Sequence, residues 1–161
     1  MLQIRQISPK DNPEVASIVR TVLMEMGAPK VGTAYADPNL DSLFETYNVP
    51  KSVYFVIEEN DEIIGGAGIA QLENETKNIC ELQKMYLLPK ARGRGLATTL
   101  MEMCLKNAHD FGFESCYIET MPYMKDAQKL YLKFGFYYLS EPMGNTGHNS
   151  CPVWMLLPLN P

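Results

Sequence analysis

Hydrophobic positions along this chain follow two periods, and their alternation predicts strands interleaved with helices. Runs that alternate or stay apolar predict strands at 2–7, 53–57, 63–70, 79–88, 116–120, 136–139 and 153–157. Apolar residues at helical spacing predict helices from about Pro13 to Gly27 and over 40–47, 94–111 and 124–134. Because strands and helices mix along the whole chain, the pattern predicts an α/β (α+β) fold in which helices pack on a sheet.

The composition is that of an ordinary globular protein. With 161 residues, 46% of them hydrophobic, and no linker or repeat, we expect a single domain over 1–161. No apolar run is long enough to span a bilayer, and residues 1–7 alternate like a strand rather than a signal peptide, so we expect no membrane partner. The four cysteines form no C-x-x-C pair, which favours a reducing cytoplasm and predicts no metal site.

The net charge of −5 bears on which classes of molecule the protein can bind. Proteins that bind nucleic acid usually present a basic face, and none is evident here, so we expect no nucleic-acid partner. A mildly acidic chain is compatible with a cationic amine as substrate, although overall charge is poor evidence about one pocket.

The most informative segment follows the predicted strand 79–88 and opens the predicted helix 94–111. Residues 92–98 read Arg-Gly-Arg-Gly-Leu-Ala-Thr. Glycines allow a tight turn and a close approach to a ligand, and the first N–H groups of a helix together with its dipole favour an anion. Because the two arginines can pair with phosphate oxygens, the segment predicts a phosphate or pyrophosphate site.

A second motif lies near the end of the predicted helix 124–134. Ala127, Leu130, Tyr131 and Phe134 fall on one helical face, and Gly135 ends the helix. Packing alone predicts that the Tyr131 ring faces the core, where its hydroxyl needs a partner.

Together the two motifs resemble those of the GNAT superfamily of acyl-CoA-dependent N-acyltransferases. The family's pyrophosphate motif is Arg or Gln, two residues, Gly, one residue, and Gly or Ala, and it is matched by Arg92, Gly95 and Ala97. The family's later helix ends in Leu-Tyr-x-x-x-Gly-Phe, which is matched by Leu130, Tyr131, Gly135 and Phe136. The resemblance is dense from about Ile63 to Tyr138, and it implies a mixed, strongly bent central sheet flanked by helices on both faces.

The resemblance implies an N-acetyltransferase that moves an acetyl group from acetyl-CoA to a primary amine by direct attack in a ternary complex, without a metal. In the family, a bulge separates the central strand from its neighbour, and its backbone amides bind the pantetheine arm and polarise the thioester carbonyl. Met85, Tyr86 and Leu87 occupy the corresponding positions. The pyrophosphate is expected at the glycine-rich turn, on Arg92, Gly93, Arg94, Gly95, Leu96, Ala97 and Thr98.

The resemblance also places Tyr131 beside the departing sulfur as the general acid. A base is needed as well, because an alkyl ammonium with a pKa of ~10.4 is protonated at neutral pH and is no nucleophile. Glu81 in the central strand and Glu119 at the end of the next strand are both candidates, directly or through water. Both stand in apolar runs, so we expect at least one to face a cleft with a raised pKa; the sequence does not decide between them.

Residues of the acceptor pocket are the least defined, since the resemblance is weak at both ends of the chain. Tyr35, Tyr123 and His148 are candidates. Some family members carry an asparagine that contacts the cofactor near position 124, where this chain has Met124. We expect a small amine as the acceptor, with a protein N-terminus or lysine as the alternative. Homodimers are common in the family, so a homodimer stays open.

Two other interpretations of the motifs exist. Gly93 to Thr98 contains the first two glycines of G-x-G-x-x-G, with Glu119 downstream, but Thr98 takes the place of the third glycine and no regular βαβαβ unit is predicted. A non-catalytic acyl-CoA sensor or scaffold would keep the turn without turnover. The presence of Tyr131 and two candidate carboxylates argues against that interpretation.

Overall fold

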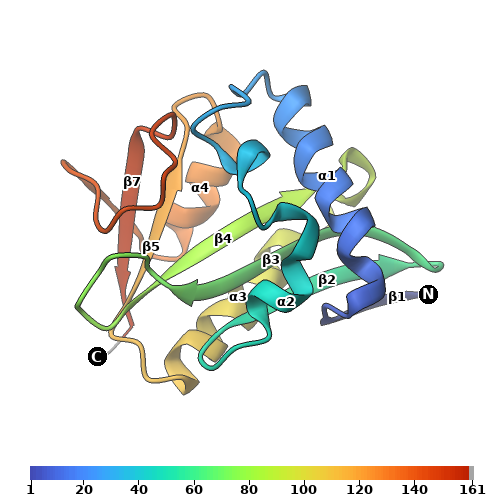
Figure 1. Ribbon diagram of the computed structural model, residues 1–161, viewed down its shortest axis with the longest axis horizontal. Coiled ribbons are helices and arrows are strands. Elements are labelled where there is room, and N and C mark those ends of the chain that lie inside the picture. The colour runs from blue at the N-terminus through green and yellow to red at the C-terminus, as the bar shows by residue number, and fades with distance from the viewer. Residues whose placement is uncertain (160–161) are drawn as a thin grey trace.

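The computed structural model describes residues 1–159, and it confirms the mixed order of strands and helices (Figure 1). The strands are β1 (Leu2–Gln6), β2 (Val53–Glu59), β3 (Glu62–Gln71), β4 (Ile79–Leu87), β5 (Ser115–Thr120), β6 (Tyr137–Leu139) and β7 (Val153–Pro158). The helices are α1 (Asn12–Glu25), α2 (Leu43–Tyr47), α3 (Leu96–Asp110) and α4 (Lys125–Lys133). The last two residues of the domain expected over 1–161 lie outside the described residues.

The strands form one sheet in the order β1-β2-β3-β4-β5-β7-β6. Neighbours are antiparallel except for β4 and β5, which are parallel because α3 carries the chain back between them. Their parallel register runs only from Ile79–Ser115 to Glu81–Tyr117, although β4 continues to Leu87 and β5 to Thr120. The two central strands therefore part after Glu81, in the middle of the sheet.

Both faces of the sheet are buried, and β2 shows how. Val53, Phe55 and Ile57 belong to the core that the sheet shares with α3 and α4. The residues between them, Tyr54 and Val56, belong to the core beneath α1 and α2. Figure 1 shows these helix pairs on opposite faces of the sheet. The prediction of a mixed sheet flanked by helices on both faces is thus confirmed, and burial on both faces explains the nearly continuous apolar run of β2.

Two further expectations concern membranes and cysteines. Within residues 1–159, no helix combines the length and the apolar character that crossing a bilayer requires. The four cysteines are free thiols and all are buried, where they pack as small hydrophobic side chains. The described part of the chain also holds no cluster of three or more His, Cys, Asp or Glu side chains arranged to bind a metal ion.

Candidate active site

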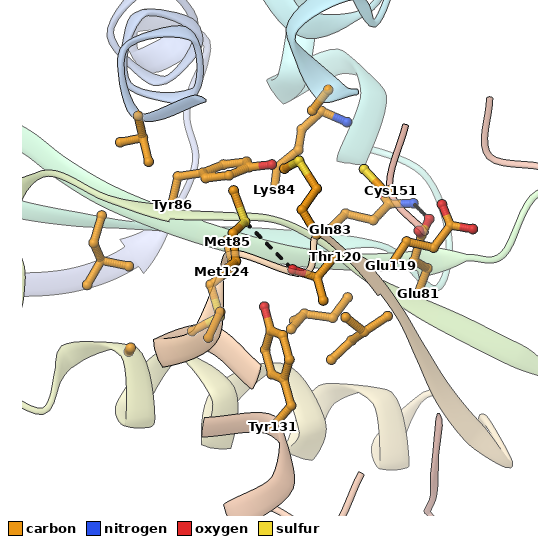
Figure 2. Close-up of a pocket in the computed structure, with 18 of the residues that line it drawn as sticks. Glu81, Gln83, Lys84, Met85, Tyr86, Glu119, Thr120, Met124, Tyr131 and Cys151 are labelled. Atoms are coloured by element: carbon orange, nitrogen blue, oxygen red, sulfur yellow. Dashed lines mark hydrogen bonds between the residues drawn. The ribbon is translucent and has the colours of Figure 1, made fainter. Parts of the chain in front are cut away.

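A cavity of about 800 Å³ opens where β4 and β5 part. Residues 81–87 of β4 and 118–120 of β5 line its two walls, and these segments extend from the last parallel pair, Glu81–Tyr117. The glycine-rich turn before α3 lines one end, and loop residues from both halves of the chain line the other. Figure 2 shows Tyr131 of α4 pointing toward this gap, with Glu81 and Glu119 side by side in it. The split in the sheet therefore creates the site.

The glycine-rich turn has the geometry of an anion site. Gly93 and Gly95 have left-handed φ angles of 72° and 76°, so the helix that the sequence predicts from Arg94 begins instead at Leu96. A Cβ atom added at either glycine would meet no atom within 4 Å, which leaves the turn open to a ligand. Among the described residues, no side chain caps the N-terminus of α3. Its first N–H groups are available to an anion in the cavity.

The two arginines of the turn are already paired with carboxylates. Arg92 lines the cavity, where its Nη2 lies 2.7 Å from Glu25 of α1 and its Nε donates to the carbonyl of Leu87. Arg94 pairs with Glu59 of β2 at 2.6 Å, and it is not among the residues that line the cavity. The sequence suggested two equivalent phosphate-binding arginines, whereas the structure separates them.

A bulge shapes the β4 wall of the cavity. Gly66 of β3 pairs with Tyr86 and Gly68 pairs with Gln83, so β4 carries one extra residue between these pairs. Within that stretch, Lys84 has a left-handed φ of 49°, which is uncommon for a residue with a side chain. Its carbonyl accepts a hydrogen bond from the Tyr54 hydroxyl. Met85, Tyr86 and Leu87, the positions at which the sequence predicts backbone contacts, follow directly and line the cavity.

The Tyr131 side chain is 6% exposed and packs in the core against Phe136, with ring centroids 5.9 Å apart. Its ring lines the cavity, and Figure 2 shows the hydroxyl directed at the opening between β4 and β5. Burial raises the pKa of this hydroxyl above its ordinary value of 10. The group therefore stays protonated at neutral pH and is available as a proton donor.

The Glu81 side chain is 5% exposed and lies at the point where the strands part. Gln83 donates to its Oε1 at 2.8 Å, and Tyr47 in turn donates to the Gln83 carbonyl oxygen at 2.6 Å. Burial, assisted by the negative charge of Glu119, raises the pKa of Glu81 to about 7. A carboxyl group with this pKa can accept a proton near neutral pH.

Glu119 lies in the same cavity but has different hydrogen-bond partners. The Tyr117 hydroxyl donates to its Oε2 at 2.7 Å, and the Thr146 hydroxyl donates to its Oε1. Both carboxylate oxygens thus accept a hydrogen bond from a hydroxyl. The structure brings together the two carboxylates between which the sequence did not decide, and it gives them unequal surroundings.

His148 belongs to a charged cluster that the sequence did not predict. Its Nε2 lies 2.8 Å from Asp37 Oδ1, and Lys84 Nζ lies 2.8 Å from Asp37 Oδ2. All three side chains line the cavity. Asp37 and Lys84 were missed because no local motif marks them: they stand in a predicted loop and a predicted strand, and 111 positions separate Asp37 from His148.

Of the remaining predicted pocket residues, some line the cavity and one does not. Tyr123 lines the cavity and is about half exposed, and Met124 lines it beside Thr120, whose hydroxyl contacts the Met124 sulfur (Figure 2). Tyr35 is not among the lining residues. Its ring makes a cation–π contact with Lys30, whose Nζ lies 5.3 Å from the ring centroid. Cys151 also lines the cavity, but burial raises the pKa of its thiol to about 12, which keeps it protonated and weakly nucleophilic.

Comparisons with known sequences point to one family. A family model described as the acetyltransferase (GNAT) family matches residues 21–136. The chain is also similar to the uncharacterized N-acetyltransferase YjgM of Escherichia coli K12. The two are 44% identical over 154 residues, which cover 95% of this chain and 92% of that protein.

Solved structures share the fold at low sequence identity. An acetyltransferase of the GNAT family from Staphylococcus aureus Mu50 superposes with a TM-score of 0.87 at 17% identity, over 99% of this chain and 100% of that one. YncA from Salmonella typhimurium, solved with acetyl-CoA, superposes with a TM-score of 0.80 at 18% identity, over 100% and 95% of the two chains. The fold of this chain, including its central sheet, is therefore shared with these solved structures.

Proposed function

Because the chain belongs to the GNAT family of acetyltransferases, we propose that it transfers an acetyl group from acetyl-CoA to the amine of a small acceptor, in a complex that holds both substrates together. The observation that carries this proposal is the split between β4 and β5. One cavity there joins an open helix N-terminus, a buried tyrosine hydroxyl and a carboxyl group with a pKa of about 7.

The residues at the turn suit the diphosphate of acetyl-CoA. Gly93 and Gly95 leave space beside the N–H groups that open α3, and Arg92 borders the same end of the cavity. From there the pantetheine arm would follow the β4 wall at Met85 to Leu87 toward Tyr131. The length of the cavity along β4 supports this path.

The transfer removes two protons from the acceptor nitrogen and supplies one proton to sulfur. The neutral amine nitrogen forms a bond to the acetyl carbon while the carbon–sulfur bond breaks. Glu81 takes the proton that the ammonium loses before it attacks, and Tyr131 gives its hydroxyl proton to the departing thiolate. The acylated nitrogen then loses a second proton, which restores the Tyr131 hydroxyl. The products are the acetamide and CoA thiol, and one net proton is released when Glu81 and Tyr131 return to their starting states.

Glu81 fits the role of base better than Glu119. Both Glu119 oxygens accept hydrogen bonds from hydroxyls, whereas Glu81 accepts a single bond from the Gln83 amide. Hydrogen bonds to a carboxylate weaken it as a base, and burial strengthens Glu81. Glu119 would then act beside Glu81 by holding the positive charge of the incoming ammonium.

A small acceptor is favoured by the loops at the far end of the cavity. The Ser150 N–H donates to the Gly32 carbonyl, and His148 contacts Asp37, so the loop before β7 closes over the loop after α1. Gly32 has a left-handed φ of 78°, and an added Cβ there would overlap Asn149 and Ser150. This enclosed end has room for a free amine more readily than for a folded protein surface.

Calorimetric titration with acetyl-CoA, with NAD as the control, tests the proposal first. We expect acetyl-CoA to bind, NAD not to bind, and Gly95→Glu to weaken acetyl-CoA binding, because its side chain places a negative charge at the turn. Amine-dependent release of CoA thiol then tests the transfer. Binding without release by any amine would instead indicate a sensor, and preference for NAD would overturn the assignment of the turn.

A further inference from the structure

We propose that the acceptor carries an acidic group in addition to its amine, and that Lys84 and His148, both held by Asp37, bind that acidic group. The inference rests on the proposed acetyl transfer and concerns the identity of its second substrate. It places the acidic group at the loop end of the cavity and the amine between Glu81 and Glu119.

The first observation that supports an acidic group on the acceptor is the buried charge of Lys84. Its side chain is only 7% exposed, and its ammonium meets Asp37 at 2.8 Å. Within residues 1–159, no other acidic side chain lies within ion-pair distance of this ammonium, which has three N–H donors. A buried lysine is costly unless its charge is matched, and one carboxylate shared with a second cation matches it incompletely.

The second cation is His148. Burial lowers the pKa of its imidazole, but the hydrogen bond to Asp37 and the charge of that carboxylate outweigh burial and raise the pKa above 6.5. Lys84 and His148 in turn hold the pKa of Asp37 below its ordinary value despite burial. With His148 protonated, the three groups carry one net positive charge. Asp37 is fully engaged by the two cations, so the cluster presents positive charge to a ligand.

The cavity has a cationic pole, formed by Lys84 and His148, and an acidic pole, formed by Glu81 and Glu119. Glu81 and Glu119 come from the adjoining strands β4 and β5, and both face the same space as Lys84 and His148. The two poles lie close enough that the charges of His148 and Lys84 both act on the Glu81 carboxyl group. An acceptor with one ammonium and one acidic group would satisfy both poles. A simple alkylamine would leave the cationic pole unmatched, and a polyamine would be repelled by it.

The backbone at Lys84 supports a role beyond joining the loops. The contact between His148 and Asp37 already links the loop before β7 to the loop after α1. Lys84 adds a charge from the sheet itself, at a left-handed position on the bulge that lines the cavity. Unusual backbone angles of this kind cluster at binding sites, where the surrounding structure holds them.

Wild-type protein tests the inference without any variant. Acceptors are compared in matched sets: an L-amino acid, its amide, and the amine left after removal of the carboxylate, with β-alanine and 4-aminobutyrate to vary the spacing of the two charges. We expect kcat/KM to be at least ~10-fold higher for the acid than for its amide in the preferred set, because the amide leaves the cationic pole unmatched. Equal rates for acid, amide and amine, or faster amide turnover, would overturn the inference.

The Lys84→Met variant then tests whether Lys84 contacts the acidic group of the acceptor. The variant should lower kcat/KM for the acid at least ~10-fold, mainly through KM, and change kcat/KM for the amide less than ~3-fold. Lys129→Met, an exposed lysine on α4 outside the cavity lining, is the matched control. An equal loss for acid and amide would contradict binding by Lys84. If Lys84→Met does not fold, Asp37→Asn and inhibition of wild-type turnover by the amine-free acid replace it.

The outcomes separate this inference from the proposed function. If acetyl-CoA binds and amines release CoA thiol without preference for acids, acetyl transfer stands and only the inference fails. If no amine of any kind releases CoA thiol, the proposed function itself fails.

Discussion

The Tyr54 hydroxyl of β2 reaches across β3 and donates a hydrogen bond of 2.7 Å to the carbonyl of Lys84 in β4. The Tyr54 ring can take this path because Gly66 and Gly68 lie beneath it. A Cβ at Gly66 would approach the ring at 2.7 Å, and one at Gly68 would approach it at 2.6 Å. Gly66 and Gly68 of β3 thus leave room for the Tyr54 side chain, whose hydrogen bond stabilises the bulge of β4.

We expect Tyr54→Phe to destabilise the protein by about 1–2 kcal/mol, because it leaves the partly buried Lys84 carbonyl without its hydroxyl partner. Turnover should fall as well, since the bulge lines the candidate site. Thermal unfolding and CoA release measure the two effects. Tyr138→Phe, which removes an exposed hydroxyl bonded to Gln128, is the matched control and should change both little. A Tyr54→Phe variant with wild-type stability and turnover would show that the bond is dispensable.

Tyr131→Phe should lower kcat by roughly 10²- to 10⁴-fold and leave acetyl-CoA affinity nearly unchanged, because it removes only the proton donor. The ring still fills its place beside Phe136, so folding should be retained. Steady-state kinetics and calorimetry on the same preparation separate the two quantities. Tyr137→Phe on β6 provides a comparison at an exposed position. Unchanged kcat would exclude Tyr131 as the acid.

The pH dependence of kcat/KM should report Glu81. With an acceptor amide, which makes no use of the His148 charge, kcat/KM should rise with pH through about 7 and level off above it, because Glu81 must be deprotonated to act as the base. Glu81→Gln should lower the plateau and abolish this rise. Glu119→Gln is the discriminating variant, because it should weaken acceptor binding but keep a rise with pH. If the rise disappears in Glu119→Gln and survives in Glu81→Gln, the assignment of the base is reversed.

The same carboxyl group links activity to stability. Folding raises the pKa of Glu81 from 4.5 to about 7, so the folded state binds this proton more tightly than the unfolded state. Its contribution is therefore present below pH 4.5 and is lost as pH rises through about 7. We expect Glu81→Gln to exceed the wild type in stability at pH 8 by up to about 3 kcal/mol, and to match it at pH 4. Denaturant unfolding at both pH values measures the difference. A variant that is less stable at pH 8 would contradict the raised pKa.

Arg92 and Arg94 should differ in their effect on acetyl-CoA binding. Arg92 borders the cavity, and a phosphate that replaced Glu25 as its partner would gain a charged hydrogen bond. We expect Arg92→Ala to weaken acetyl-CoA binding about 10-fold, and Arg94→Ala to weaken it less than about 2-fold. Titration calorimetry at two salt concentrations compares the variants. Equal weakening would show that Arg94 leaves Glu59 when acetyl-CoA binds.

The sequence by itself determined the elements and the two motifs. Hydrophobic patterning is a local property, so the apolar run of β2 and the helical spacing of α3 predict the element types. The left-handed φ angles of Gly93 and Gly95, by which the helix begins at Leu96 instead of Arg94, are permitted by glycine itself and are not reported by the hydrophobic period. The glycine-rich turn and the helix that carries Tyr131 were also recognisable, because each is continuous in the chain.

Only the tertiary structure decided how distant residues meet. The end of the β4–β5 register after Glu81, the hydrogen bonds that make Glu81 and Glu119 unequal, and the capture of Arg94 by Glu59 all depend on contacts between separate elements. The cluster of Asp37, Lys84 and His148 joins two loops and a bulge. No local pattern encodes such a cluster, because its energy comes from charges that only the folded chain brings together and buries.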